Sequence, residues 1–399
     1  MKAFPPYFLI LFVMLFSGHA RAMRYEDAFL SYGGHSRFAV LKASEFMKIR
    51  RESQQDIVEI ENALHEKACG SSLRKLEGFD DRLLAYVPLF GLSFLTHLDL
   101  SSNKLTYLPA TLSLLQHLTW FSASNNQLTM FPIHCCSFSR LHTLFLHRNS
   151  LETLPPAIGD LHNLTFLFLQ DNRLSALPQE IHTLSQLKIV NVSHNRLRTL
   201  PTSIGDLHKL YQLDISRNCL SSLPHAVGLL QALTHLDVHE NFLSTLPETL
   251  GDCLRLCFLD ASDNALQSLP DTLGKLINLM HLDLAENQLE ALPFTVGDLS
   301  SLCCLDVSRN ALNELPTSFM KLKKLKSVYA CDNDLESLCG RVAGLASLEV
   351  LDVSYNHISM LPQEIAGLNE LRYLVVHNNR LTHSYHGMWP HLITIEHGQ

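Results

Sequence analysis

The sequence predicts an α/β solenoid, with one curved parallel sheet on the concave side and short helical turns on the convex side. Three observations lead to this prediction. Thirteen asparagines recur every 23 residues from Asn103 to Asn379, a leucine stands eight positions before each of them, and the positions between them follow the same period. A single unit of this length cannot bury its leucines alone, whereas stacked units form one continuous leucine core.

The order of residues within each period predicts its elements. The pattern is L-x-x-L-x-L-x-x-N-x-L-x-x-L-P-x-x-I-G-x-L, and its first six residues alternate as expected of a strand whose leucines point into the core. Leu-Pro and the apolar residues after it predict a short helical turn. Eleven of the thirteen periods keep the proline, and Cys339 and Tyr385 replace it in the other two. The pattern is that of leucine-rich repeats.

The repeated asparagines are expected to be buried in the turn after each strand. There an amide side chain both donates to and accepts from the backbone of adjacent units. Loss of one would leave peptide groups unpaired, at a cost of about 1 to 3 kcal/mol. This asparagine ladder consists of Asn103, Asn126, Asn149, Asn172, Asn195, Asn218, Asn241, Asn264, Asn287, Asn310, Asn333, Asn356 and Asn379.

The repeats define the remaining boundaries. We expect a leader at residues 1–22, an N-terminal segment at 23–72, a degenerate first repeat at 73–94, thirteen repeats at 95–393 and a tail at 394–399. Between Ser36 and Lys67 apolar residues such as Phe46, Ile49 and Ile57 recur at helical spacing. An amphipathic helix here would cap the exposed leucines of the first unit, because terminal repeats need a polar outer face. A separate partner-binding helix is the alternative.

The first 22 residues have the pattern of a secretory signal peptide. Lys2 precedes ten apolar residues from Tyr7 to Phe16, and Ala20-Arg21-Ala22 is a small-x-small cleavage site. The apolar stretch is too short for a transmembrane helix, so no membrane span is predicted. If this leader is used, the chain enters the secretory pathway; if translation starts at Met23, it is cytoplasmic. The ten cysteines form no terminal cluster, which favours a reducing compartment.

Composition and motifs argue against several functional classes. The net charge is −8 and the sequence has no long basic run, so a nucleic-acid partner is not expected. We find no G-x-S-x-G, H-E-x-x-H or phosphate-loop motif. The sequence therefore predicts neither an enzyme nor a cofactor.

The convex half of the repeat resembles the Ras-group leucine-rich repeat family of intracellular scaffolds. The sequences Leu200-Pro-Thr-Ser-Ile-Gly-Asp-Leu207 and Leu269-Pro-Asp-Thr-Leu-Gly-Lys-Leu276 show the LPxxIGxL form best, and the resemblance covers about three quarters of the chain. It implies a non-enzymatic protein-binding scaffold in signalling or cell organisation. The leader departs from this pattern, so an extracytoplasmic recognition protein for glycan or peptide ligands is the alternative.

One column of concave residues is acidic. The position between the last two strand leucines holds an aspartate in five consecutive repeats, and these are Asp214, Asp237, Asp260, Asp283 and Asp306. We expect them to form a stripe that receives a basic segment of a protein or extended peptide. The alternative is that Leu-Asp-Leu is simply the usual sequence of such a repeat.

A second group of concave residues is apolar. Trp120, Phe145, Phe166, Phe168 and Ile189 occupy outward strand positions in the second to fifth repeats. The sequence therefore predicts an exposed patch with aromatic anchors for a partner. The alternative is that the N-terminal segment folds back over it.

The segment from His235 to His239 raises the question of a metal site, because Asp237 lies between the two histidines. Neighbours on the same face of a strand are about 7 Å apart, which is too far for one ion without help from an adjacent strand. The sequence favours solvated histidines, and no metal is predicted.

Overall fold

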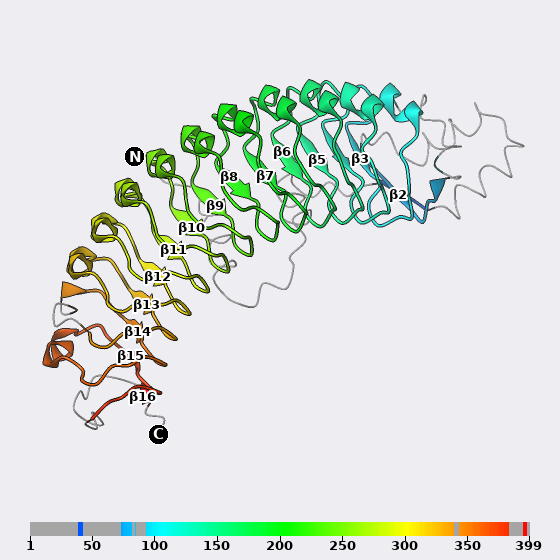
Figure 1. Ribbon diagram of the computed structural model, residues 1–399. Coiled ribbons are helices and arrows are strands. Elements are labelled where there is room, and N and C mark those ends of the chain that lie inside the picture. The colour runs from blue at the N-terminus through cyan, green and yellow to red at the C-terminus, as the bar shows by residue number, and fades with distance from the viewer. Residues whose placement is uncertain are drawn as a thin grey trace, which may run out of the picture.

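The chain forms a single parallel sheet wound into a curved solenoid (Figure 1). The computed structural model describes residues 39–42, 73–81, 84, 93–338, 342, 344–382 and 394–396. Sixteen strands follow one another in sequence order across the sheet, and every pair of neighbours is parallel. Short helical turns line the outer side of the curve (Figure 1). The predicted fold class is confirmed.

The strands are short and evenly spaced. They are β1 (Ala39–Lys42), β2 (Leu73–Glu77), β3 (His97–Asp99), β4 (Trp120–Ser122), β5 (Thr143–Phe145), β6 (Phe166–Phe168), β7 (Ile189–Asn191), β8 (Gln212–Asp214), β9 (His235–Asp237), β10 (Phe258–Asp260), β11 (His281–Asp283), β12 (Cys304–Asp306), β13 (Ser327–Tyr329), β14 (Val350–Asp352), β15 (Tyr373–Val375) and β16 (Thr394–Glu396). From β3 to β15 equivalent residues pair directly, so a position in one repeat lies beside the same position in the next.

The convex turns are 3-10 helices of five residues. They are η3 (Ala110–Leu114), η4 (Ile133–Ser137), η5 (Pro156–Asp160), η6 (Gln179–Thr183), η7 (Thr202–Asp206), η8 (His225–Leu229), η9 (Glu248–Asp252), η10 (Asp271–Lys275), η11 (Phe294–Asp298), η12 (Thr317–Lys321) and η14 (Gln363–Gly367). In η8 the preceding Pro224 has φ of −67°, which suits its ring, and its carbonyl accepts from Val227 N–H at 3.0 Å. Proline precedes each of these turns in the same way.

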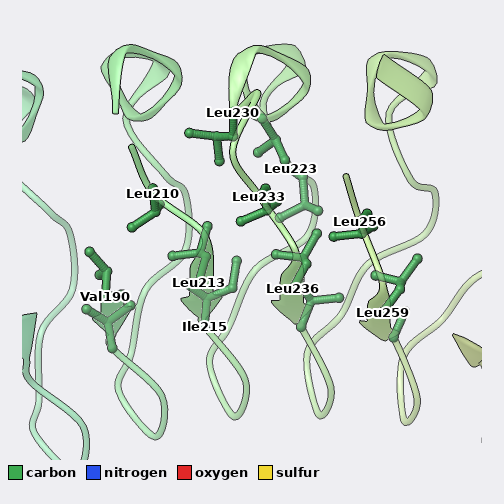
Figure 2. Close-up of a cluster of buried hydrophobic side chains, with 14 of the residues drawn as sticks. Val190, Leu210, Leu213, Ile215, Leu223, Leu230, Leu233, Leu236, Leu256 and Leu259 are labelled. Carbon is green, nitrogen blue, oxygen red and sulfur yellow. The ribbon is translucent and has the colours of Figure 1, made fainter. Parts of the chain in front are cut away.

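Leucines from successive repeats fill the space between the sheet and the turns. Figure 2 shows Leu213, Leu236 and Leu259 from three neighbouring strands at equivalent positions, and all three are fully buried. Leu233 and Leu256 extend the same layers toward the convex side (Figure 2). Each unit thus buries its apolar face only against its neighbours, which explains why the fold requires repetition.

The asparagine after each strand connects adjacent repeats. Asn218 Oδ1 accepts from Leu197 N–H at 2.9 Å, and Nδ2 donates to the carbonyls of Val192 and Ile215, each at 3.0 Å. The other asparagines of the ladder make the same kinds of bond. The residue before each asparagine has a positive φ, for example 52° at Arg217, so the chain turns sharply there.

The N-terminal part differs from the sequence expectation where it is described. Ala39–Lys42 forms strand β1 and pairs with β2, although the helical pattern was expected from Ser36 onward. Leu73 of β2 pairs with His97, an offset of 24 residues, whereas matching Leu73 to Leu95 required 22. The ladder bond of this unit is also displaced: Asn103 Oδ1 accepts from Phe79 N–H, 24 residues earlier, whereas Asn126 Oδ1 accepts from Leu105 N–H, 21 residues earlier.

The chain end also adds a strand. Thr394–Glu396 forms β16 and pairs with β15, so the expected tail begins inside the sheet. The leader at 1–22, the helical spacing from Phe46 to Leu64, Cys339 and Tyr385 lie outside the described residues. Among the residues that are described, no helix has the length and apolar character needed to cross a membrane.

Candidate binding surface on the concave sheet

Five aspartates lie side by side across β8 to β12. Direct pairing places Asp214 opposite Asp237, Asp237 opposite Asp260, Asp260 opposite Asp283 and Asp283 opposite Asp306. Neighbouring strands are about 4.8 Å apart, so the carboxylates are held at close range by the sheet itself. We call these five residues the acidic column.

One oxygen of each column carboxylate has a local structural role. Asp260 Oδ1 accepts from the N–H of Ser262 at 3.0 Å and from its hydroxyl at 2.6 Å, and Asp214 and Asp306 bind the serine two residues later in the same way. The same turn recurs outside the column, for example at Asp352. This recurrence supports the alternative interpretation, in which aspartate is common at this position because the turn of the repeat uses it.

The second oxygen is the part of the column that can serve recognition. Asp214 Oδ2 accepts from Asn191 Nδ2 at 2.8 Å. Among the described residues, Oδ2 of Asp237, Asp283 and Asp306 accepts no such side-chain hydrogen bond within the column. Each carboxylate therefore uses one oxygen for the turn, and the second oxygen of Asp237, Asp283 and Asp306 is not needed for it.

Burial, and after it crowding by neighbouring carboxylates, makes the negative charge of the column costly. Burial raises the pKa of Asp283 to about 7, with a further contribution from the neighbouring charge of Asp260. Burial and then the charge of Asp237 raise the pKa of Asp214, and the pKa values of Asp260 and Asp306 are also raised, chiefly by burial. A bound cation would relieve this repulsion.

His239 is a cationic group within the column. Its Nδ1 lies 2.7 Å from Asp237 Oδ1 and 4.0 Å from Asp260 Oδ2, and its Nε2 lies 3.8 Å from Glu240. Burial lowers the pKa of His239, but the hydrogen bond to Asp237 and the charges of nearby aspartates outweigh burial and raise it to about 9. Arg217 binds Glu240 instead of the column, at 2.7 Å.

The histidines expected near this site separate into two environments. His235 and His281 lie on either side of Phe258, with ring centroids 5.9 and 4.8 Å away and interplanar angles of 22° and 7°. Burial lowers the pKa of both histidines, that of His281 to about 4, so both rings are neutral at pH 7. Of the two histidines in the His235–His239 segment, His239 is the one that contacts the carboxylates of the column.

The aromatic group forms a separate buried cluster. Trp120 is 8% exposed, Phe145 0% and Phe168 1%, so the expectation that these three side chains form an exposed patch is wrong. Phe145 stacks on Phe168 with centroids 4.7 Å apart and lies 5.4 Å from Trp120. Phe166 and Ile189 are half-buried and pack against this cluster. The strand period gives the direction of a side chain but not its neighbours in space.

One feature of the surface was not identified from the sequence, namely the residue that completes each turn. It lies two positions after each aspartate, and after β9 this residue is His239. The sequence contains a signal for this role, since Ser216, Ser262 and Ser308 occupy the position equivalent to His239. Glu240 lies near the column through His239 and Arg217.

Comparison with known proteins supports the repeat architecture. Leucine-rich repeat models match residues 163–220, 184–243 and 323–381, and a second such model matches residues 94–115. A leucine-rich repeat protein of Leptospira interrogans is 29% identical, with 85% of this chain and 91% of that chain covered and a TM-score of 0.75. No curated protein matches the sequence.

Two further solved structures share the fold. The plant peptide hormone receptor RGFR1, in complex with RGF2, is 29% identical, with 77% of this chain and 50% of that chain covered and a TM-score of 0.67. The present chain therefore spans half the length of that receptor chain. The functional domain of InlJ from Listeria monocytogenes is 24% identical, with coverages of 78% and 65% and a TM-score of 0.66. The matched repeats and the parallel solenoid together show that the chain has the fold of a leucine-rich repeat solenoid.

Proposed function

We propose that the chain is a non-enzymatic binding protein whose acidic column receives a basic segment of a protein or extended peptide. The observation that carries this proposal is the direct pairing of five aspartates on β8 to β12. Lysine and arginine side chains would replace repulsion between neighbouring carboxylates with attraction. Binding of this kind weakens as salt is added.

The similar structures support a protein or peptide ligand. RGFR1 is a plant peptide hormone receptor and was solved in complex with RGF2. By this similarity we expect a protein or peptide as the class of ligand for this chain. The basic character of the ligand comes from the acidic column.

The aromatic cluster contributes to binding indirectly, whereas the sequence suggested direct anchors. Trp120, Phe145 and Phe168 are buried, so they support the neighbouring surface instead of contacting a ligand directly. Phe166 and Ile189 are half-buried at the edge of that cluster and are the members that a ligand would reach. A Phe168→Ala variant would therefore test packing as well as recognition.

Titration with nona-arginine tests the proposal, with nona-glutamate as the charge control. A triple variant, Asp237→Asn/Asp260→Asn/Asp283→Asn, should bind nona-arginine at least about tenfold more weakly than the wild type, because three attractive charges are lost. The matched control is Asp160→Asn/Asp206→Asn/Asp271→Asn, which removes the same charge from the exposed convex turns η5, η7 and η10. Equal losses in the two triple variants would show that only net charge matters and would reject the column as the site.

The cellular setting is a second part of the proposal. We place the chain with scaffolds of the Ras-group type, on the support of LPxxIGxL sequences such as Leu200–Leu207. An extracytoplasmic recognition role is the alternative supported by residues 1–22. Mass spectrometry of the mature N-terminus, combined with fractionation of the same sample, separates the two: a cleaved leader in a secreted fraction rejects the intracellular scaffold.

A further inference from the structure

We propose that Asp237, His239 and Asp260 form a binding site for a divalent transition-metal ion of the zinc class. The three residues each offer one ligand atom, and these atoms lie within 4.8 Å of one another. The site goes beyond the proposed recognition of a basic segment, because it requires only the metal ion.

The sheet itself brings the three side chains together. Asp237 and Asp260 pair directly between β9 and β10, and His239 follows Asp237 by two residues on the same side of the chain. The sequence alone placed His235, Asp237 and His239 too far apart along one strand to share an ion. The adjacent strand supplies the missing ligand, Asp260, and His235 is instead stacked on Phe258.

The observed distances lie close to those of a zinc site. Zinc binds imidazole nitrogen and carboxylate oxygen at about 2.0 to 2.2 Å in tetrahedral geometry, which sets neighbouring ligand atoms about 3.3 Å apart. His239 Nδ1 lies 2.7 Å from Asp237 Oδ1 and 4.0 Å from Asp260 Oδ2, on either side of that separation. Small rotations of these side chains would place the ion between them.

The ion can enter from the concave side. The side chains of His239, Asp237 and Asp260 are 24%, 27% and 19% exposed. When the ion binds, a nitrogen–metal bond forms at Nδ1, and the proton held there goes to solvent. A position of the metal would remain for water, as zinc with three protein ligands has one coordination position left.

His239 is not needed for the local turn, which gives an independent reason to assign it a role. Ser216, Ser262 and Ser308 stand at the equivalent position and bind the column aspartate through both N–H and hydroxyl. A serine would therefore complete this turn as well. Histidine is the residue here that adds a nitrogen ligand, and a nitrogen ligand beside two carboxylates favours zinc over calcium or magnesium.

Calorimetric titration of the full chain with Zn²⁺ alone tests the proposal. One site should saturate in the wild type, and His239→Ser and Asp260→Asn should each weaken binding at least about tenfold. His239→Ser introduces the residue that the column already uses, so its fold should be retained, which circular dichroism and thermal unfolding would check. Co²⁺ in place of Zn²⁺ should give visible absorption that His239→Ser reduces.

Two comparisons make the test specific. His235→Gln removes a histidine on the same strand outside the site and should leave Zn²⁺ affinity unchanged, a necessary control in a chain with 22 histidines. Ca²⁺ and Mg²⁺ should bind more weakly than Zn²⁺. Equal Zn²⁺ affinity in the wild type and His239→Ser, absence of saturable binding by the wild type, or tighter binding of Ca²⁺ would overturn the proposal. None of these outcomes depends on nona-arginine, so the metal site and the proposed function can fail separately.

Discussion

His239 Nδ1 lies 2.7 Å from Asp237 Oδ1, which places an imidazole inside a column of carboxylates. The contact is not part of the repeated architecture, since serine fills the equivalent position in Ser216, Ser262 and Ser308. It binds one aspartate directly, and its charge also lowers the pKa values of Asp214, Asp260 and Asp283, although burial still keeps them raised. The column therefore combines a structural turn, which the fold repeats, with a charge distribution that is particular to β8 through β12.

The acidic column makes stability depend on pH. The pKa of Asp283 is raised from 3.8 to about 7, so its contribution to stability is fully present below about pH 4 and is lost as pH rises through about 7. We expect Asp283→Asn to be more stable than the wild type at pH 8, by about 1 kcal/mol or more, and therefore to unfold at a higher temperature. Its stability should also change less between pH 5 and 8. Thermal unfolding across this range measures both effects.

His239 extends the same trend to higher pH. Its pKa is raised from 6.5 to about 9, so its stabilising contribution is present below about pH 6.5 and disappears as pH rises through about 9.

Asp271→Asn, on the convex turn η10, is the control for Asp283→Asn and should unfold with the pH dependence of the wild type. If Asp283→Asn also showed the wild-type change of stability with pH, burial of the Asp283 carboxylate would be contradicted.

The asparagine ladder predicts a large difference between two similar substitutions. Asn218→Ala leaves the buried Leu197 N–H without its partner and removes the Nδ2 bonds to three backbone carbonyls, so it should reduce the free energy of unfolding by about 1 to 3 kcal/mol or more. Asn278→Ala removes one exposed bond, to the carbonyl of Leu254, and should cost less than about 1 kcal/mol. Urea unfolding of the two variants compares them, and equal losses would reject the structural role of the ladder.

Close packing of the convex turns gives a matched pair of glycine substitutions. A Cβ at Gly228 would lie 2.2 Å from the carbonyl oxygen of Thr249, so Gly228→Ala should destabilise the chain by about 1 to 3 kcal/mol. A Cβ at Gly367 would meet nothing within 4 Å, and Gly367→Ala should be neutral or stabilising by up to about 1 kcal/mol. Thermal unfolding distinguishes the variants. A neutral Gly228→Ala would mean that η8 and η9 pack less closely than the structure shows.

Burial of the aromatic cluster can be tested in the same way. Phe145 is fully buried and stacked on Phe168, so Phe145→Ala should cost about 3 to 5 kcal/mol. Phe242 is 63% exposed, and Phe242→Ala should change stability by no more than about 0.5 kcal/mol. If both variants unfolded in urea like the wild type, the aromatic side chains would be exposed, as the strand pattern alone suggested.

The sequence predicted the repeated part of the fold because its physical cause is local and periodic. The leucines before each asparagine determine which side of a strand is buried, and the period determines which residues pair across strands. The same reasoning located the acidic column from Asp214 to Asp306. It could not locate the ends, because β1 and the offset between Leu73 and His97 do not follow the period.

The details of the site depended on side-chain positions that a period does not specify. Both His235 and His239 point to the concave side in the sequence pattern. In the structure one stacks on Phe258 and the other binds Asp237. Likewise, the outward direction of Phe145 was predicted with exposure as the expectation, and burial was considered only as cover by the N-terminal segment.

Proton release on ligand binding tests the acidic column most directly. At pH 7 a bound cation should lower the raised pKa of Asp283 and its neighbours, so protons should leave the protein when nona-arginine binds. Calorimetry in two buffers of different ionisation enthalpy measures this release. The account predicts proton release by the wild type and a smaller release, with weaker binding, by Asp237→Asn/Asp260→Asn/Asp283→Asn. Binding of nona-arginine with the same affinity and the same proton release in both proteins would contradict it.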